Sequence, residues 1–159
     1  MMATRAGSID PGVIIRLLRD RHLTVDELEE ALEHESGLLA IGGTADMRLL
    51  LEREKAGDER AALAVAMFTD RAAAALSSAM TRLETLDALV FTGGIGENAA
   101  QIRSRVCRRL RIVGVPSVPA RRVGRDAIVS GCNRRPAVLR IAAREDVVIA
   151  RAVERLAGG

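Results

Sequence analysis

The stretch Leu86–Ala99, L-D-A-L-V-F-T-G-G-I-G-E-N-A, carries more structural information than any other part of this 159-residue chain. An apolar run from Ala88 to Phe91 ends in a threonine and three closely spaced glycines, and apolar residues then recur at spacings of three and four through Val113. This order predicts a buried strand, a glycine turn and the start of a helix. Glycines there let the backbone approach a ligand closely, and the unpaired N–H groups of a helix start favour phosphate or other polar ligand atoms. The stretch therefore indicates a nucleotide-binding turn.

Three interpretations of this turn compete when it is considered alone. A Walker A phosphate loop is excluded, because no Gly-Lys-Ser/Thr follows the glycines and Lys55 is the chain's only lysine. The string G-I-G-E-N-A matches the loose dinucleotide fingerprint G-x-G-x-x-A, but no further acidic residue follows it until Asp126, whereas a ribose-binding one is expected about 20 positions on. The third interpretation is a left-handed structural turn that binds nothing.

The longer string F-T-G-G-I-G-E-N, residues 91–98, resembles the adenosine-binding motif of the acetate kinases and of the related propionate and butyrate kinases. Three further segments resemble motifs of the same family, in the same order along the chain. They are T-R-A-G-S-I-D-P-G at 4–12, S-G-L-L-A-I-G-G at 36–43 with D-M-R at 46–48, and E-D-V-V-I-A-R at 145–151. Because the four segments span nearly the whole chain, the sequence is identified as a member of the acetate kinase family.

The resemblance implies an α/β fold: one half of the duplicated actin-like, ribonuclease-H-like ATPase fold of the acetate and sugar kinase superfamily. It implies ATP-dependent phosphoryl transfer to a short-chain carboxylate (acetate + ATP to acetyl phosphate + ADP), with ATP/ADP and Mg²⁺ as cofactors and a homodimer as the assembly. Family members are more than twice as long, and the part absent here holds the acid pocket, a catalytic aspartate, two histidines and a magnesium ligand. We therefore expect residues 1–159 to be a single C-terminal nucleotide-binding domain, without the N-terminal domain and inactive alone.

The resemblance also implies roles for individual residues. Arg5 would stabilise charge on the transferring phosphoryl group, since a guanidinium stays ionised and pairs two phosphate oxygens at once. Glu145 would be a magnesium ligand, because Mg²⁺ takes hard oxygen donors. The residues expected to contact the nucleotide are Asp46, Met47, Arg48, Gly94, Ile95, Gly96, Glu97 and Asn98. Two positions depart from the family pattern: Ala3 replaces a glycine and Gly42 replaces a serine.

Two other functions stay open on the sequence. The chain could be a non-catalytic adenine-nucleotide-binding module, because the catalytic cleft of the family needs both domains. It could also be a dinucleotide-binding oxidoreductase domain, an interpretation that rests on G-I-G-E-N-A alone and that the absent acidic residue disfavours. The choice between acetate, propionate and butyrate depends on the part of the family pattern that is absent here.

Composition excludes further classes of function. The chain has no Trp or Tyr and only two Phe, and the arginines between 103 and 111 circle several faces of one predicted helix, so we expect no nucleic-acid partner. The longest apolar run, Ala61–Phe68, is far shorter than the roughly 20 residues of a membrane-spanning helix, and residues 1–10 lack the apolar core of a signal peptide. The sequence therefore predicts a soluble, cytoplasmic protein without a membrane partner. Cys107 and Cys132 match no metal or redox spacing and are expected to be reduced thiols.

Periodicity and capping signals, among them Asp10-Pro11 and a Thr24–Glu27 capping box, predict the secondary structure. Helices are expected over 11–19, 24–34, 45–55, 59–83, 97–110 and 146–156, and strands over 37–41, 88–91 and 138–142, with turns and short strands between 113 and 133. Alternating strands and helices favour a layered α/β architecture.

Overall fold

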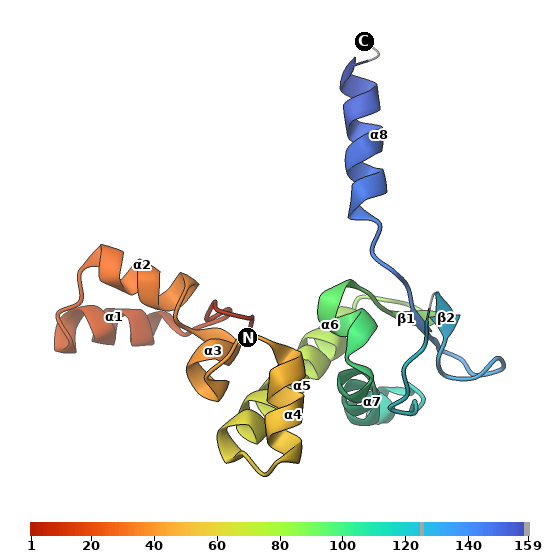
Figure 1. Ribbon diagram of the computed structural model, residues 1–159, viewed down its shortest axis with the longest axis horizontal. Helices are drawn as coiled ribbons and strands as arrows, with labels where there is room; N and C mark the ends of the chain where they lie inside the picture. The colour runs from red at the N-terminus through yellow and green to blue at the C-terminus, as the bar shows by residue number, and fades with distance from the viewer. Residues whose placement is uncertain (125, 158–159) are drawn as a thin grey trace. The chain divides into compact units, whose positions relative to one another are not determined.

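The computed structural model describes residues 1–124 and 126–157, and the chain divides into two units, residues 1–82 and 83–159 (Figure 1). Unit 1 contains helices α1 (Pro11–Asp20), α2 (Val25–Glu33), α3 (Gly37–Gly42), α4 (Met47–Lys55) and α5 (Glu59–Met80). The described part of unit 2 contains β1 (Ala88–Phe91), α6 (Gly93–Asn98), α7 (Ala100–Arg109), the 3-10 turn η1 (Leu110–Val113), β2 (Ala127–Ile128), β3 (Ala137–Arg140) and α8 (Glu145–Ala157).

Side-chain caps fix the helix starts of unit 1. The Asp10 carboxylate accepts a hydrogen bond from the Gly12 amide ahead of α1. At α2, Thr24 Oγ1 accepts from the Glu27 amide at 3.2 Å while Glu27 Oε2 accepts from the Thr24 amide at 2.8 Å, which confirms the predicted capping box. The Asp58 carboxylate caps α5 by accepting from the Ala61 amide. These bonds satisfy amides that would otherwise lack an intrahelical partner.

The core of unit 1 forms where α5 packs against α3 and α4. Leu38, Leu50 and Val65 are completely buried there. The glycine at position 42, where the family pattern has a serine, is explained by this packing, because a Cβ on Gly42 would collide with Leu50 Cδ2 and lie 3.0 Å from Ala64 Cβ. Close approach of α3 to its neighbours thus depends on the absence of a side chain at this position.

The prediction of a strand over 37–41 is wrong, because these residues form α3. Gly37 adopts a φ of +65°, and the amides of Leu38 and Leu39 donate to the carbonyl oxygens of Met2 and Ala3. A short apolar run such as G-L-L-A-I suits a buried strand and a buried helical turn equally well, so its pattern could not decide between them.

The sheet of unit 2 has the order β1–β3–β2 within the described residues. Strands β1 and β3 are parallel, with Ala88 opposite Ala137 and Phe91 opposite Arg140, and β2 is antiparallel to β3. The parallel pair requires a crossover connection, which includes α6 and α7. The carboxyl ends of β1 and β3 consequently meet at one edge of the sheet, so the glycine turn after β1 and residues 141–144 after β3 lie side by side.

The helix predicted to run from 97 to 110 is interrupted. Residues Gly93–Asn98 form the short helix α6, and Ala99, with φ −97° and ψ 81°, separates it from α7. Buried residues of α7 and η1, including Ile102, Val106 and Leu110, form the core of this unit. The strand predicted over 138–142 is observed one residue earlier and ends at Arg140.

Helix α8 confirms the predicted closing helix, and none of its described residues is buried. Within residues 1–124 and 126–157, no helix is both long and apolar enough to cross a membrane.

Candidate functional site

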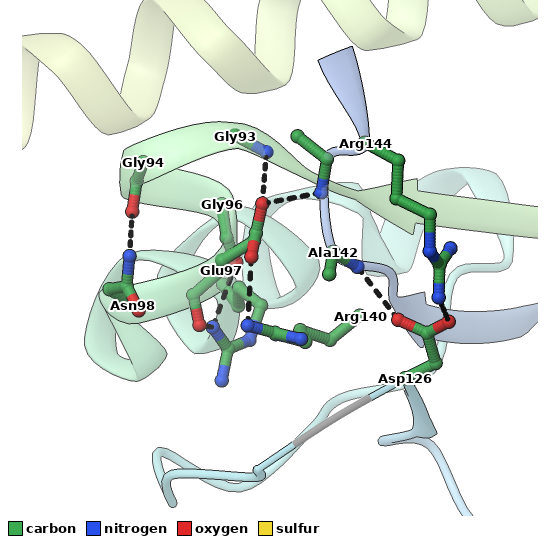
Figure 2. A network of polar contacts seen from close by, with 11 residues as sticks. Gly93, Gly94, Gly96, Glu97, Asn98, Asp126, Arg140, Ala142 and Arg144 are labelled. Carbon is green, nitrogen blue, oxygen red and sulfur yellow. Dashed lines mark hydrogen bonds and ion pairs between the residues drawn. The ribbon is translucent and has the colours of Figure 1, made fainter. Parts of the chain in front are cut away.

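The glycine turn is a compact helical turn held against the end of β1. Gly93 has a φ of +71°, a conformation that strains other residues. A Cβ on Gly96 would lie only 3.3 Å from the carbonyl carbon of Phe91, so the backbone at position 96 packs directly against the strand. Asn98 Nδ2 donates to the Gly94 carbonyl oxygen at 2.9 Å (Figure 2). Glycines are therefore needed at positions 93 and 96 by the shape of the turn itself.

Glu97 lies at the centre of this region (Figure 2). Its Oε1 accepts from the Gly93 amide at 3.0 Å and from the Ala143 amide at 2.8 Å, and its Oε2 accepts from Arg140 Nη2 at 2.8 Å. The Glu97 and Arg140 side chains are only 14% and 10% exposed, so their ion pair is largely shielded from water. One carboxylate thus joins the glycine turn to the end of β3 and to the residues that follow it.

A second buried arginine supports the same turn from within. Arg103 is 2% exposed, and its Nη1 donates to the carbonyl oxygens of Gly96 and Glu97, both at 2.8 Å. Burial lowers the pKa of Arg103, and the nearby charge of Arg140 lowers it further. A guanidinium is suited to this place because the last carbonyls of a short helix carry partial negative charge and lack intrahelical partners.

Neither Arg103 nor Arg140 is predicted from the sequence as a site residue, although each leaves a signal in the sequence. Arg103 falls on the apolar face of α7, next to Ile102 and one turn before Val106 and Cys107. Arg140 ends the otherwise apolar strand A-V-L-R. A charged residue in a buried pattern predicts a buried partner.

Residues 141–144 are fixed by a second carboxylate (Figure 2). Asp126 Oδ1 accepts from the Ala142 amide at 2.8 Å, and its Oδ2 pairs with Arg144 Nη2 at 2.6 Å. These two bonds, the Ala142 amide first, lower the pKa of Asp126. The segment that leads into α8 is therefore held by Glu97 and by Asp126.

Glu145 is exposed as the first residue of α8, and no hydrogen bond or ion pair of its side chain occurs among the described residues. The described residues contain no group of three His, Cys, Asp or Glu side chains that could hold a metal ion by themselves. A single accessible carboxylate fits Mg²⁺ nonetheless, because Mg²⁺ is often bound by one or two carboxylates together with substrate phosphates and water.

Arg5 lies in a segment tied to α2 in unit 1. Its Nε pairs with Glu33 Oε2 at 2.7 Å, and both side chains are about half exposed. The flanking backbone is ordered by bonds from the Ala6 amide to the Leu32 carbonyl and from Thr4 Oγ1 to the Glu33 carbonyl. The guanidinium thus has a carboxylate partner that an anionic ligand would have to displace or share.

The three residues Asp46, Met47 and Arg48 differ in what they offer a ligand. Asp46 caps α4 by accepting from the Arg48 amide at 2.8 Å, and the two side chains form an exposed ion pair at 3.6 Å. Met47 is 5% exposed and belongs to the core of unit 1, so only its backbone could face a ligand.

Comparison with known proteins agrees with the motifs and the fold. The sequence model of the Acetokinase family matches residues 1–151. The chain belongs to this family. It is 41% identical to the acetate kinase of Synechococcus sp. over 162 aligned residues, which cover 100% of this chain and 40% of that protein. It is 37% identical to the propionate kinase of Citrobacter rodentium, over 99% of this chain and 39% of that protein.

The structural comparison gives the same result. The crystal structure of Porphyromonas gingivalis acetate kinase superposes on 96% of this chain and 39% of its own, with a TM-score of 0.87 and 30% identity. The predicted α/β fold of the acetate and sugar kinases is thus confirmed, as is the family. This acetokinase-family chain spans about 40% of the length of the relatives that it matches.

Proposed function

We propose that this chain is the C-terminal, adenine-nucleotide-binding portion of a carboxylate kinase that transfers the γ-phosphoryl group of ATP to acetate or a similar short-chain acid. The observation that carries the proposal is the glycine turn at the carboxyl end of β1, joined by Glu97 to the segment that precedes Glu145. Ligands of α/β folds bind at the carboxyl ends of parallel strands, so the turn has the location that such a site requires.

The roles proposed for the remaining residues follow from their exposure and charge. The backbone from Gly94 to Asn98 would contact the nucleotide, and Asn98 is exposed with its amide oxygen available as an acceptor. Glu145 would supply one oxygen ligand to Mg²⁺, which when bound neutralises phosphate charge. Arg5 would add the positive charge that phosphoryl transfer needs around its equatorial oxygens. Asp46 and Arg48 would contact the adenine and ribose of the nucleotide.

Isothermal calorimetry of the 159-residue chain tests nucleotide binding. We expect Mg·ATP and Mg·ADP to bind with free energies of about −4 to −6 kcal/mol, because a partial site leaves the phosphates in water. NAD should bind more weakly, since the turn has no acidic partner for the ribose. NAD binding tighter than ATP would instead support the oxidoreductase alternative.

A hydroxamate assay with acetate, ATP and Mg²⁺ tests catalysis by the same chain. We expect no turnover above background, because no residue here is assigned to hold the acid in line with the γ-phosphate, and such positioning supplies roughly 7–11 kcal/mol of barrier lowering. Turnover that disappears in Arg5→Ala would show that the chain carries a complete site. Nucleotide binding without turnover in any longer form of the protein would favour the non-catalytic module.

We also propose a homodimer in the cytoplasm. Alanines in the C-terminal half of α5, Ala74 and Ala75 among them, are exposed and allow close packing of a second copy. Light scattering that shows a monomer at high protein concentration would contradict the dimer.

A further inference from the structure

We propose that Glu97 is a positioning residue of the nucleotide site and not a nucleotide ligand, and that Arg140 and Arg103 act with it. The inference rests on the proposed function, because it concerns the same glycine turn, but its first test requires no ligand.

The Glu97 carboxylate has little capacity left for a ligand. A carboxylate offers about four lone-pair positions, and three of them are already used by two backbone amides on Oε1 and the Arg140 guanidinium on Oε2. The side chain is 14% exposed. A carboxylate would also repel the phosphates of a nucleotide, whereas pairing with Arg140 offsets its charge inside the fold. The number of its bonds, its burial and its charge all indicate that the Glu97 carboxylate binds groups of the protein and not a nucleotide.

The arrangement of these bonds gives Glu97 a specific task. The amides of Gly93 and Ala143 both donate to the same oxygen, Oε1. Gly93 begins the glycine turn, and Ala143 lies two residues before Glu145. One oxygen atom therefore sets the separation between the turn and the segment that carries the proposed magnesium ligand.

The two arginines bind different parts of Glu97. Arg140 binds its carboxylate, and the parallel register places Arg140 opposite Phe91, the last residue of β1. Arg103 binds the carbonyl oxygens of Gly96 and of Glu97 itself. Arg140 is 8% exposed as a whole residue, its Nη2 donates to Glu97, and its buried Nε has no hydrogen-bond partner within residues 1–124 and 126–157. Loss of Glu97 would remove the carboxylate that pairs directly with this buried guanidinium.

Amide hydrogen exchange, followed by NMR on the 159-residue chain without ligand, tests the positioning contacts. The Gly93 and Ala143 amides should exchange slowly in the wild-type chain and rapidly in Glu97→Ala. Glu84→Ala is the matched control, because Glu84 is an exposed glutamate of the same unit with no partner among the described residues. Unchanged protection of both amides in a folded Glu97→Ala chain would overturn the proposal.

A pair of variants distinguishes loss of the positioning contacts from a general loss of stability. It also replaces the first test if Glu97→Ala does not fold. In Glu97→Gln the amide oxygen can still accept from the two backbone amides, but its NH₂ group faces the donors of Arg140. Replacing Arg140 by Met as well removes that conflict. Protection of Gly93 and Ala143 should therefore fall in Glu97→Gln and recover in Glu97→Gln/Arg140→Met. Failure of the double variant to recover protection would contradict the assigned geometry.

Calorimetry with ADP, in the presence of Mg²⁺ and then of a chelator, tests the consequence for the site. Mg²⁺ should strengthen ADP binding to the wild-type chain, and this strengthening should fall about tenfold in Glu97→Ala. Losses of this size are usual when a residue that orients a metal-binding side chain is removed. If the wild-type chain binds no ADP, the proposed function is wrong, but the hydrogen-exchange result still tests the contacts of Glu97. Lost protection with unchanged Mg·ADP affinity would overturn the positioning role, and lost affinity with full protection would make Glu97 a ligand.

Discussion

Replacement of Arg103 by Met removes a buried charge that supports the glycine turn and keeps most of the side chain's apolar volume. The substitution breaks the two 2.8 Å bonds from Arg103 to the carbonyl oxygens of Gly96 and Glu97. Hydrogen bonds to a charged donor contribute about 1.5–3 kcal/mol each. Burial, and to a smaller extent the nearby charge of Arg140, disfavour the charged Arg103 guanidinium, and both lower its pKa. Subtracting part of that cost leaves an expected loss of about 2–4 kcal/mol in the unfolding free energy of unit 2.

Hydrogen exchange with mass spectrometry is the appropriate assay, because a chain of two units need not unfold in one step. Peptides from residues 83–157 should lose protection in Arg103→Met, while peptides from residues 1–82 should not change. Arg108→Met is the matched control, since Arg108 lies on the same helix and is exposed. Arg103→Lys should be intermediate, because a single ammonium cannot reproduce the planar geometry of the guanidinium.

Agreement in stability between Arg103→Met and Arg108→Met within about 0.5 kcal/mol, the usual range for surface substitutions, would contradict a supporting role of Arg103. The buried guanidinium would then be replaceable, and its bonds to the carbonyl oxygens of Gly96, Glu97 and Arg121 would add nothing beyond what its desolvation costs.

The remaining predictions concern three single residues. Burial raises the pKa of Cys107 to about 12, so a thiol reagent at pH 8 should label Cys132 alone in the native chain and both thiols after denaturation. An exposed thiol ionises near pH 9.0, so below that pH the Cys107 thiol stays protonated in both the folded and the unfolded chain and its contribution to stability is complete. Above pH 9.0 ionisation favours the unfolded chain, and denaturation curves should show the unfolding free energy lower by about 2 kcal/mol at pH 10.5. Thr24→Ala removes the capping box and should lower the stability of α2 by about 1 kcal/mol, seen as faster exchange of its amides; unchanged exchange would contradict the capping role. Gly42→Ser, which restores the family residue, should destabilise unit 1 by about 1–3 kcal/mol through collision with Leu50, and a raised melting temperature would count against this packing.

Features encoded by residues close together in the sequence were predicted correctly. The Asp10 and Thr24 caps, the strand Ala88–Phe91 and the glycines that follow it depend on neighbours within a few positions. The family follows from motifs of the same local kind. The helix at residues 37–42 was missed, because its amides bond to carbonyl oxygens of Met2 and Ala3, more than thirty positions away.

The supporting contacts of the site could not be predicted for the same reason. Glu97 and Arg140 are 43 positions apart, and only the parallel pairing of β1 with β3 brings them together. The motif drew attention to Glu97 as part of a ligand-binding string, yet its carboxylate is directed to Gly93, Ala143 and Arg140 within the fold. A sequence pattern shows which residue type is required at a position but not whether the partner is a ligand or the protein itself.

Nucleotide binding by the glycine turn can be observed residue by residue in a titration of the ¹H–¹⁵N spectrum of the 159-residue chain with Mg·ADP and, in a separate sample, with NAD. Saturable shifts should be largest at the amides of Gly94, Ile95, Gly96 and Asn98, and NAD should require higher concentrations to produce any of them. Saturable ADP shifts that leave these four amides unmoved, or NAD saturation at lower concentration than ADP, would contradict the claim that this turn binds an adenine nucleotide.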